Sequence, residues 1–235
     1  MPKKPKRHEL QQRDFRIKHG LEQTKKRVIL PERHLFVTEG TKTEPNYLNG
    51  LVDLICERYG PSVRKQFDII GEGTNTLNLL QRAEAHQHNE AYGYQHIWII
   101  YDKDDFPADA FDNTVNRCDS LNKRFQSEGH DIAFHAIWSN QCIELWFLLH
   151  FDYLQADIDR EQYRTILSNH LGRHYEKNDA ELFMALLPHL ERAIRNAKRQ
   201  MNNYPKESPP SQKAPATNVY KLVEHLREYI QLPEA

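Results

Sequence analysis

The stretch His96-Ile-Trp-Ile-Ile-Tyr-Asp-Lys-Asp-Asp105 decides the fold. Its first part, His96 to Tyr101, is the most continuous β-branched and aromatic run in the chain, which is typical of a strand buried on both faces of a parallel sheet. The run ends abruptly in acidic residues. The stretch therefore predicts a central strand that carries carboxylates at its carboxyl end.

Three other strand patterns accompany this one, and helical patterns alternate with them. The expected strands are residues 34–38, 67–70 and 131–138, and the expected helices are 43–59, 76–87, 108–126 and one that begins near 141. Four strand-helix units in succession predict an α/β fold, a Rossmann-like parallel sheet of about four strands with helices on both faces. We expect a capping box at Thr41-x-x-Glu44, and a cap at Ser139 or Asn140 for the helix near 141.

The organisation changes after residue 153. From there we find only helical patterns, over residues 159–170, 179–201 and 218–229, with a proline-rich loop at 202–216. We therefore expect three parts: a basic arm at 1–30, an α/β domain at 31–153, and a helical region at 154–235 that packs on that domain.

Charge is spread unevenly along the 235 residues, although the formal net charge is only −1. Residues 1–27 hold ten Lys and Arg against three acidic residues, so this segment attracts the phosphate backbone of nucleic acids. The candidate contacts in it are Lys3, Lys4, Lys6, Arg7, Lys25, Lys26 and Arg27. The alternative interpretation is a solvated, frayed terminus.

The three cysteines are too few and too scattered for a disulfide framework or a zinc site, which favours a reducing compartment. The longest apolar run, Ile143 to Phe151, contains Glu144 and His150 and is about half the length of a membrane span. We therefore expect a cytoplasmic protein without a membrane partner.

Acidic residues follow two of the expected strands directly. Glu39 comes after the first strand, and Asp102 and Asp104 come after the third. The carboxyl ends of parallel strands share one edge of the sheet, so these side chains are expected to meet there. Carboxylates that gather at one rim repel each other unless a hard cation such as Mg²⁺ or Mn²⁺ neutralises them. Such an ion activates water and stabilises charge in a displacement at phosphorus.

Each residue of this pattern also has a structural interpretation. Asp102 to Asp105 fit a turn whose side chains bond local backbone amides, and Glu39 fits a partner for the next helix dipole. Glu44 and Glu144 are further candidate metal ligands, with helix capping and a surface acid near a helix start as their alternatives. Candidate phosphate contacts outside the arm are Lys42 and Lys177, for which a solvated lysine is the alternative.

Four blocks of the sequence together resemble the RloB family. They are Val37-Thr-Glu-Gly-Thr-Lys-Thr-Glu-Pro-Asn-Tyr47, Ile100-Tyr-Asp-Lys-Asp-Asp105, Ser139-Asn-Gln-Cys-Ile-Glu-Leu-Trp-Phe-Leu-Leu-His-Phe151 and Pro215-Ala-Thr-Asn-Val-Tyr-Lys-Leu-Val223. The Glu-Gly followed by Asp-x-Asp in the first two is similar to the Toprim signature of topoisomerases, primases and overcoming-lysogenization-defect nucleases. The helices after residue 152 depart from the broader Toprim pattern.

This resemblance implies a Toprim-like fold and a Toprim nuclease of bacterial anti-phage defence and abortive infection, encoded beside an ATPase partner. Glu39 would be the general acid/base or a metal ligand, and Asp102 and Asp104 would hold Mg²⁺. Two other functions stay open: a non-catalytic metal- or partner-binding module, and a small-molecule phosphatase or phosphotransferase. The sequence leaves undecided whether DNA, messenger RNA or transfer RNA is cut, whether one ion or two bind, whether a partner must release the activity, and which oligomer forms.

Overall fold

The computed structural model describes residues 30–73, 76–87, 93–104 and 107–230. The chain divides into two compact units, residues 1–30 and residues 31–235. The basic residues of the expected arm therefore lie outside the described residues, and their role stays a prediction. Within the described ranges, none of the helices has the length and apolar character that a membrane crossing requires.

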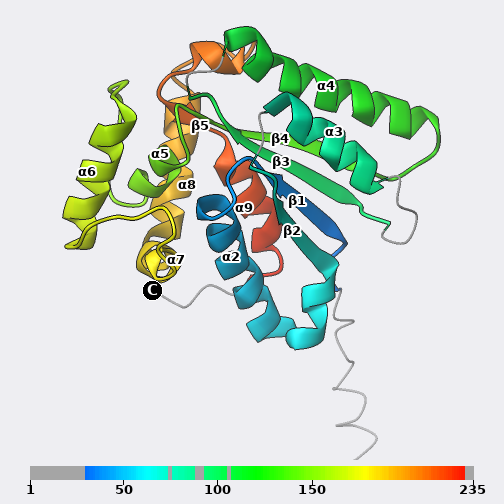
Figure 1. Ribbon diagram of the computed structural model, residues 1–235, viewed down its shortest axis with the longest axis horizontal. Helices are drawn as coiled ribbons and strands as arrows, with labels where there is room; N and C mark the ends of the chain where they lie inside the picture. Colours follow the sequence, from blue (N-terminus) through cyan, green and yellow to red (C-terminus); the bar gives the residue numbers. More distant parts are fainter. Residues whose placement is uncertain (1–29, 74–75, 88–92, 105–106, 231–235) are drawn as a thin grey trace, which may run out of the picture. The chain divides into compact units, whose positions relative to one another are not determined.

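The second unit is an α/β fold, as predicted (Figure 1). Its strands are β1 (His34–Thr38), β2 (Phe67–Gly71), β3 (His96–Asp102), β4 (Ala133–Asn140) and β5 (Ala216–Thr217). Its helices are α2 (Thr43–Tyr59), α3 (Thr76–Gln87), α4 (Ala108–Ser127), α5 (Glu144–Leu148), α6 (Arg160–Leu171), α7 (Leu182–Leu186), α8 (Leu190–Met201) and α9 (Val219–Arg227). The sheet order is β2-β1-β3-β4-β5, and the first four strands run parallel.

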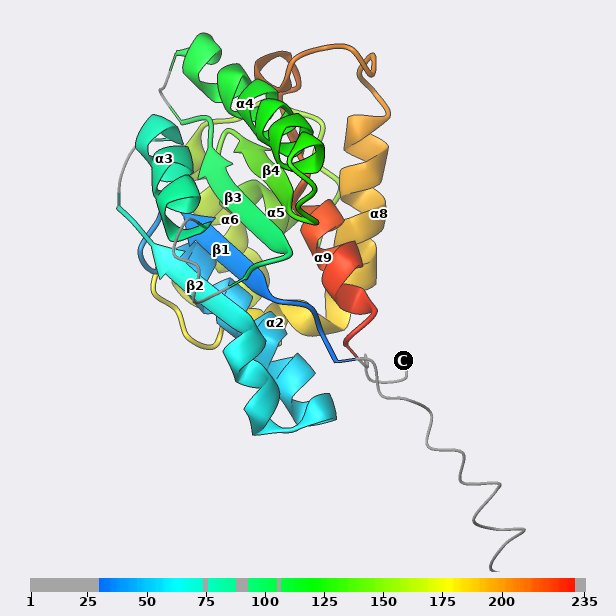
Figure 2. The same cartoon turned by 90° about the vertical axis from the view of Figure 1, so that its right-hand side faces the viewer.

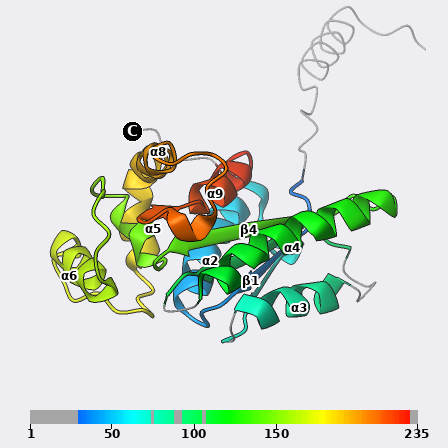
Figure 3. The same cartoon turned by 90° about the horizontal axis from the view of Figure 1, so that it is seen from above.

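The central position of β3 follows from its composition. Residues Ile97 to Tyr101 are all buried, as the sequence predicted for a strand covered on both faces. Alternate side chains enter two separate cores: Trp98 and Ile100 face the core shared with α2, α5, α8 and α9, whereas Ile99 faces the core shared with α3 and α4. Figure 3 shows α3 and α4 on one side of the sheet and α2 and α9 on the other.

The C-terminal region is helical, as predicted, but it also contributes a short strand that the sequence patterns did not indicate. Strand β5 pairs antiparallel with the end of β4, with Ser139 opposite Thr217 and Asn140 opposite Ala216. A strand of two residues has no alternation that a sequence pattern can reveal. The long helix expected at 179–201 is divided into α7, a 3₁₀ turn at Leu187–His189 and α8. Pro188 explains the break, because it has no N–H to donate to the preceding turn.

Neither predicted cap forms. Helix α2 begins at Thr43 after Lys42 and has no side-chain cap, and Ser139 and Asn140 belong to β4 instead of capping α5. A capping box does form at Asp159 and Gln162, where it fixes the start of α6. Figure 2 shows α8 and α9 together beyond the β4 edge of the sheet.

Two asparagines hydrogen-bond the backbone N–H and C=O groups at the outer edge of β4, where β5 does not reach. Asn122 from α4 accepts from the backbone N–H of Phe134 at 2.7 Å and donates to its carbonyl at 2.9 Å. Asn218 accepts from the N–H of Trp138 at 2.6 Å and donates to the carbonyl of Ala136 at 2.9 Å. Buried backbone groups at a sheet edge require such partners, so these side chains replace a further strand.

Candidate functional site

The parallel register brings Glu39 to Asp102. The backbone N–H of Glu39 donates to the carbonyl of Ile100 at 3.0 Å, which extends the pairing of β1 with β3 by one residue. In return, the N–H of Asp102 donates to Glu39 Oε2 at 3.4 Å. Two residues that are 63 positions apart in the chain are therefore neighbours at the carboxyl edge of the sheet.

A pocket of about 330 Å³ opens at this edge. All five carboxylates named from the sequence line it, together with both lysines named outside the arm: Glu39, Glu44, Asp102, Asp104, Glu144, Lys42 and Lys177. They come from the loop after β1, from α2, from the end of β3 and the loop that follows it, from α5 and from the loop after α6. Strand order brings Glu39, Asp102 and Asp104 to this edge, and the starts of α2 and α5 add Glu44 and Glu144.

Glu44 turns back toward the loop that follows β1. Its carboxylate is almost fully buried and accepts hydrogen bonds from the backbone of Gly40 and from its own N–H. Any Cβ at position 40 would collide with this carboxylate, so Gly40 permits the close approach. Burial raises the pKa of Glu44, and the neighbouring Glu144 carboxylate adds to that increase.

Asp102 lies among the other carboxylates of the pocket. Its Oδ2 accepts a hydrogen bond from the N–H of Ile143 at 3.0 Å, just before α5. Its pKa is nevertheless raised well above the usual range, first by burial and then by repulsion from Glu44, Glu144 and Asp104. Burial and the neighbouring carboxylates therefore both oppose ionisation of Asp102.

Asp104 is held by the loop that follows β4. Its N–H donates to the carbonyl of Gln141 at 3.0 Å, and the N–H of Lys103 donates to that of Ser139 at the same distance. Its φ of 37° lies in the left-handed region, which side-chain-bearing residues rarely adopt. Arg160 of α6 forms an ion pair with its Oδ1 at 3.3 Å.

Glu144 connects the pocket to the C-terminal region. The hydroxyl of Tyr175 donates to Glu144 Oε1 at 3.2 Å, and Arg164 Nε lies 3.9 Å from the same oxygen. Burial and this carboxylate raise the pKa of Tyr175. Sequence reasoning missed the roles of Arg160, Arg164 and Tyr175. The sequence does contain one signal for the arginines: Arg160 and Arg164 are four positions apart on a helix, so both lie on the same face of it.

The two candidate phosphate contacts keep exposed side chains. Lys42 precedes α2 directly, and Lys177 lies in the loop after α6. The backbone carbonyl of Lys177 accepts a hydrogen bond from the Thr43 hydroxyl at 2.8 Å, which fixes that loop against the start of α2. The charge of Lys177 opposes the increase in the pKa of Glu44. Both lysines are therefore placed at the rim of the acidic pocket.

The carboxylate oxygens of the pocket suit a hard cation, but the side chains are not arranged as a ready set of metal ligands. Carboxylate oxygens are the ligands that Mg²⁺ and Mn²⁺ prefer. Within residues 30–73, 76–87, 93–104 and 107–230, however, no group of three His, Cys, Asp or Glu side chains is arranged to hold one metal ion. Glu39 and Asp102 each accept from a backbone N–H, and Asp104 pairs with Arg160. These side chains would have to turn in order to share an ion.

Comparison with known proteins identifies a family. No curated protein and no solved structure matches the chain. The family model for the RloB-like protein matches residues 34–226, which include every element from β1 to the last turn of α9 and all the carboxylates of the pocket. The chain therefore belongs to the RloB-like family.

Proposed function

We propose that this protein is a divalent-metal-dependent nuclease that hydrolyses phosphodiester bonds of DNA or RNA at the acidic pocket. The observation that carries the proposal is that five carboxylates line one pocket at the carboxyl edge of the sheet. Burial, and then repulsion from Glu44, Glu144 and Asp104, raise the pKa of Asp102 within it. Sites that process phosphodiesters commonly gather carboxylates in this way, because a bound cation then neutralises both the protein and the substrate.

Each residue has a role in this proposal. Asp102 and Asp104 hold Mg²⁺ or Mn²⁺, with Glu44 and Glu144 as further ligands. When bound, the ion supplies Lewis acidity at the phosphate and an acidified water molecule. Glu39 accepts or donates the proton, and the Asp102 amide orients its Oε2. Lys42 and Lys177 at the rim bind the phosphates that flank the scissile bond.

Arg160 and Arg164 provide the balance of charge before an ion binds. Each forms an ion pair with one carboxylate of the pocket, Asp104 or Glu144. The planar donors of both guanidinium groups are also suited to phosphate oxygens, so these arginines would contact the substrate as well as the carboxylates. The C-terminal region thereby contributes to the site in addition to the α/β domain.

The first experiment measures Mn²⁺ binding and cleavage separately. We expect the full chain to bind Mn²⁺ in calorimetry and to cut radiolabelled DNA or RNA only when the ion is present. Asp102→Asn should lose Mn²⁺ binding and cleavage, whereas Glu39→Gln should lose cleavage while its circular dichroism spectrum is unchanged. Full cleavage by both variants would end the assignment.

Glu72→Gln is the matched control. Glu72 also follows a strand at this edge, but its carboxylate pairs with Arg82 and His86 and it does not line the pocket. The control should retain both Mn²⁺ binding and cleavage. Mn²⁺ binding that depends on Asp102, with no cleavage of DNA, RNA or transfer RNA, would instead favour the non-catalytic metal-binding module. Release of phosphate from small phosphate esters would favour a phosphatase.

The basic arm and the cellular role belong to the proposal as well. We propose that residues 1–27 retain nucleic acid, so that their deletion weakens binding and reduces its dependence on salt. From the family resemblance we further propose a cytoplasmic role in anti-phage defence under the control of an ATPase partner. In a plaque assay, cells that express the chain with that ATPase should restrict phage, and cells with Glu39→Gln should not.

A further inference from the structure

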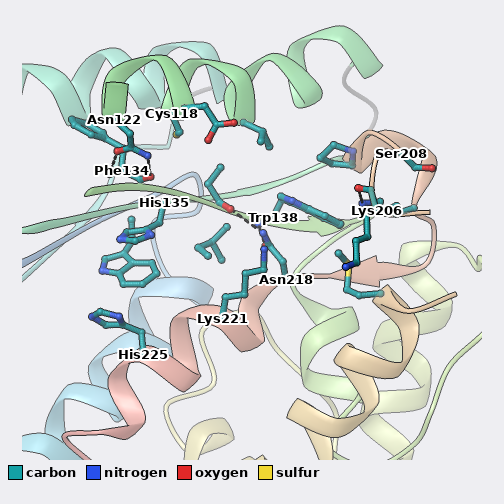
Figure 4. Close-up of a pocket in the computed structure, with 18 residues that line it drawn as sticks. Cys118, Asn122, Phe134, His135, Trp138, Lys206, Ser208, Asn218, Lys221 and His225 are labelled. Atoms are coloured by element: carbon teal, nitrogen blue, oxygen red, sulfur yellow. Dashed lines mark hydrogen bonds between the residues drawn. The ribbon is translucent and has the colours of Figure 1, made fainter. Parts of the chain in front are cut away.

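A second pocket lies along the outer edge of β4, away from the acidic one. It encloses about 520 Å³ between β4, α4, α9 and the loop that joins α8 to β5. This volume is in the range of sites for small molecules, which is about 300–1,000 Å³. Figure 4 shows His135 and His225 at one end, Lys206 and Ser208 at the other, and Asn218 and Lys221 between them.

The charged residues that line this pocket are mostly positive: three lysines against one carboxylate. Lys206, Lys213 and Lys221 come from the loop and from α9, and the carboxylate is that of the exposed Asp119. Within the described part of the chain, none of the three lysines forms an ion pair. With three lysines against one exposed carboxylate, the lining of the pocket carries a net positive charge.

Lys213 is the residue that requires an explanation. Only 7% of it is exposed, and its Nζ donates to the backbone carbonyl of Lys206 at 3.3 Å. An ammonium group has three donors, and a buried charge is costly unless it is paired. Burial lowers the pKa of Lys213 and the positive charge of Lys221 lowers it further, whereas the charge of Glu207 raises it. An anion in the pocket would pair with the ammonium group and so offset the first two effects.

The polar backbone beside the lysines is already satisfied. Asn122 and Asn218 occupy the N–H and C=O groups of β4 that border the pocket. The loop is fixed as well: Asn140 donates to the carbonyls of Pro210 and Ser211, and the Ser211 N–H and hydroxyl donate to Asp112. A ligand would therefore meet the lysine ammonium groups as charged donors, on a wall that is held in place before the ligand binds.

We propose that this pocket binds a phosphorylated small molecule, whose phosphate or pyrophosphate group pairs with Lys213 and Lys221. Ser208, at the same end of the pocket as Lys206, adds a hydroxyl donor. The apolar wall of Phe134, Ala136 and Trp138 contacts the uncharged body of the ligand. This site is independent of the nuclease proposal, since none of its lining residues lines the acidic pocket.

Calorimetry with pyrophosphate, in EDTA so that no metal-phosphate complex contributes, tests the proposal on the full chain. ADP and adenosine are titrated in parallel, because they differ in the diphosphate group and so show whether the anion is required for binding. We expect pyrophosphate and ADP to bind and adenosine not to bind. Lys213→Met should weaken pyrophosphate binding at least about tenfold, since a buried charge-assisted hydrogen bond is lost. Lys213→Arg should retain most of it.

Lys123→Met is the control, because Lys123 is an exposed lysine of α4 outside the pocket and its loss changes the net charge equally. It should bind pyrophosphate like the wild type. Lys221→Met provides a second variant with an exposed lysine, in case Lys213→Met does not fold. No binding of pyrophosphate or ADP at about 10 mM would overturn the proposal. So would unchanged binding by folded Lys213→Met, which would make this lysine a link within the loop alone.

Discussion

Acidification should destabilise this protein through His150, a fully buried histidine just after α5. Its Nδ1–H donates to the carbonyl of Trp146 at 3.0 Å, and its Nε2 has no partner among the described residues. Burial lowers its pKa from 6.5 to about 3, so the folded protein keeps the ring neutral where the unfolded chain protonates it.

The sign and size of the pH dependence of stability follow from this difference in pKa between the folded and unfolded states. Above pH 6.5 the ring is neutral in both states and contributes no pH dependence. As the pH falls from 6.5 toward 3, only the unfolded state gains a proton, and the free energy of unfolding decreases by about 1.4 kcal/mol per pH unit. At pH 5 the loss caused by His150 alone is therefore about 2 kcal/mol.

Urea denaturation of the wild type and of His150→Phe, followed by tryptophan fluorescence at pH 8 and pH 5, measures this loss. The variant leaves the Trp146 carbonyl unpaired, which has a cost that does not change with pH. We expect the stability difference between the two proteins to move by about 2 kcal/mol in favour of the variant on going to pH 5. The exposed His174→Phe is the control and should show no such movement. Equal differences at both pH values would refute the reasoning.

Three other changes test the packing and the charge of the pockets. Asp102→Asn should raise the free energy of unfolding in EDTA by about 1 kcal/mol, because it removes repulsion from Glu44 and Glu144, and it should abolish any stabilisation by Mn²⁺; a lower melting temperature in EDTA would contradict this. Gly40→Ala should destabilise the protein by about 1–3 kcal/mol in chemical denaturation, since its Cβ collides with the Glu44 carboxylate, whereas Gly40→Ala combined with Glu44→Ala should recover part of that loss. Asn218→Ala should cost about 2–4 kcal/mol by the same assay, because it leaves the Trp138 N–H and the Ala136 carbonyl without partners, and an effect below about 0.5 kcal/mol would show that the β4 edge does not depend on it.

Much of the architecture could be predicted because its signals are local. The runs at 34–38, 67–70, 96–101 and 131–138 are long and apolar enough to specify strands, and intervening helices make parallel pairing the expected arrangement. From that topology the proximity of Glu39 to Asp102 followed without any coordinates. The predicted caps at Glu44 and Asn140 did not form because both side chains have other partners: Glu44 bonds the backbone of Gly40, four residues earlier, and Asn140 bonds the distant loop at Pro210.

The sequence by itself determined the α/β class, the membership of the parallel sheet and the edge at which the carboxylates gather, because periodicity and strand order are properties of neighbouring residues. Only the tertiary structure decided that α6 places Arg160 and Arg164 on those carboxylates, that β5 closes the sheet, and that Lys213 is buried beside Lys221. The arginine pairs and the pairing of β5 with β4 join residues that are 20 to 78 positions apart. Burial and charge pairing between distant residues depend on how whole helices and strands pack, and a short stretch of sequence does not predict that packing.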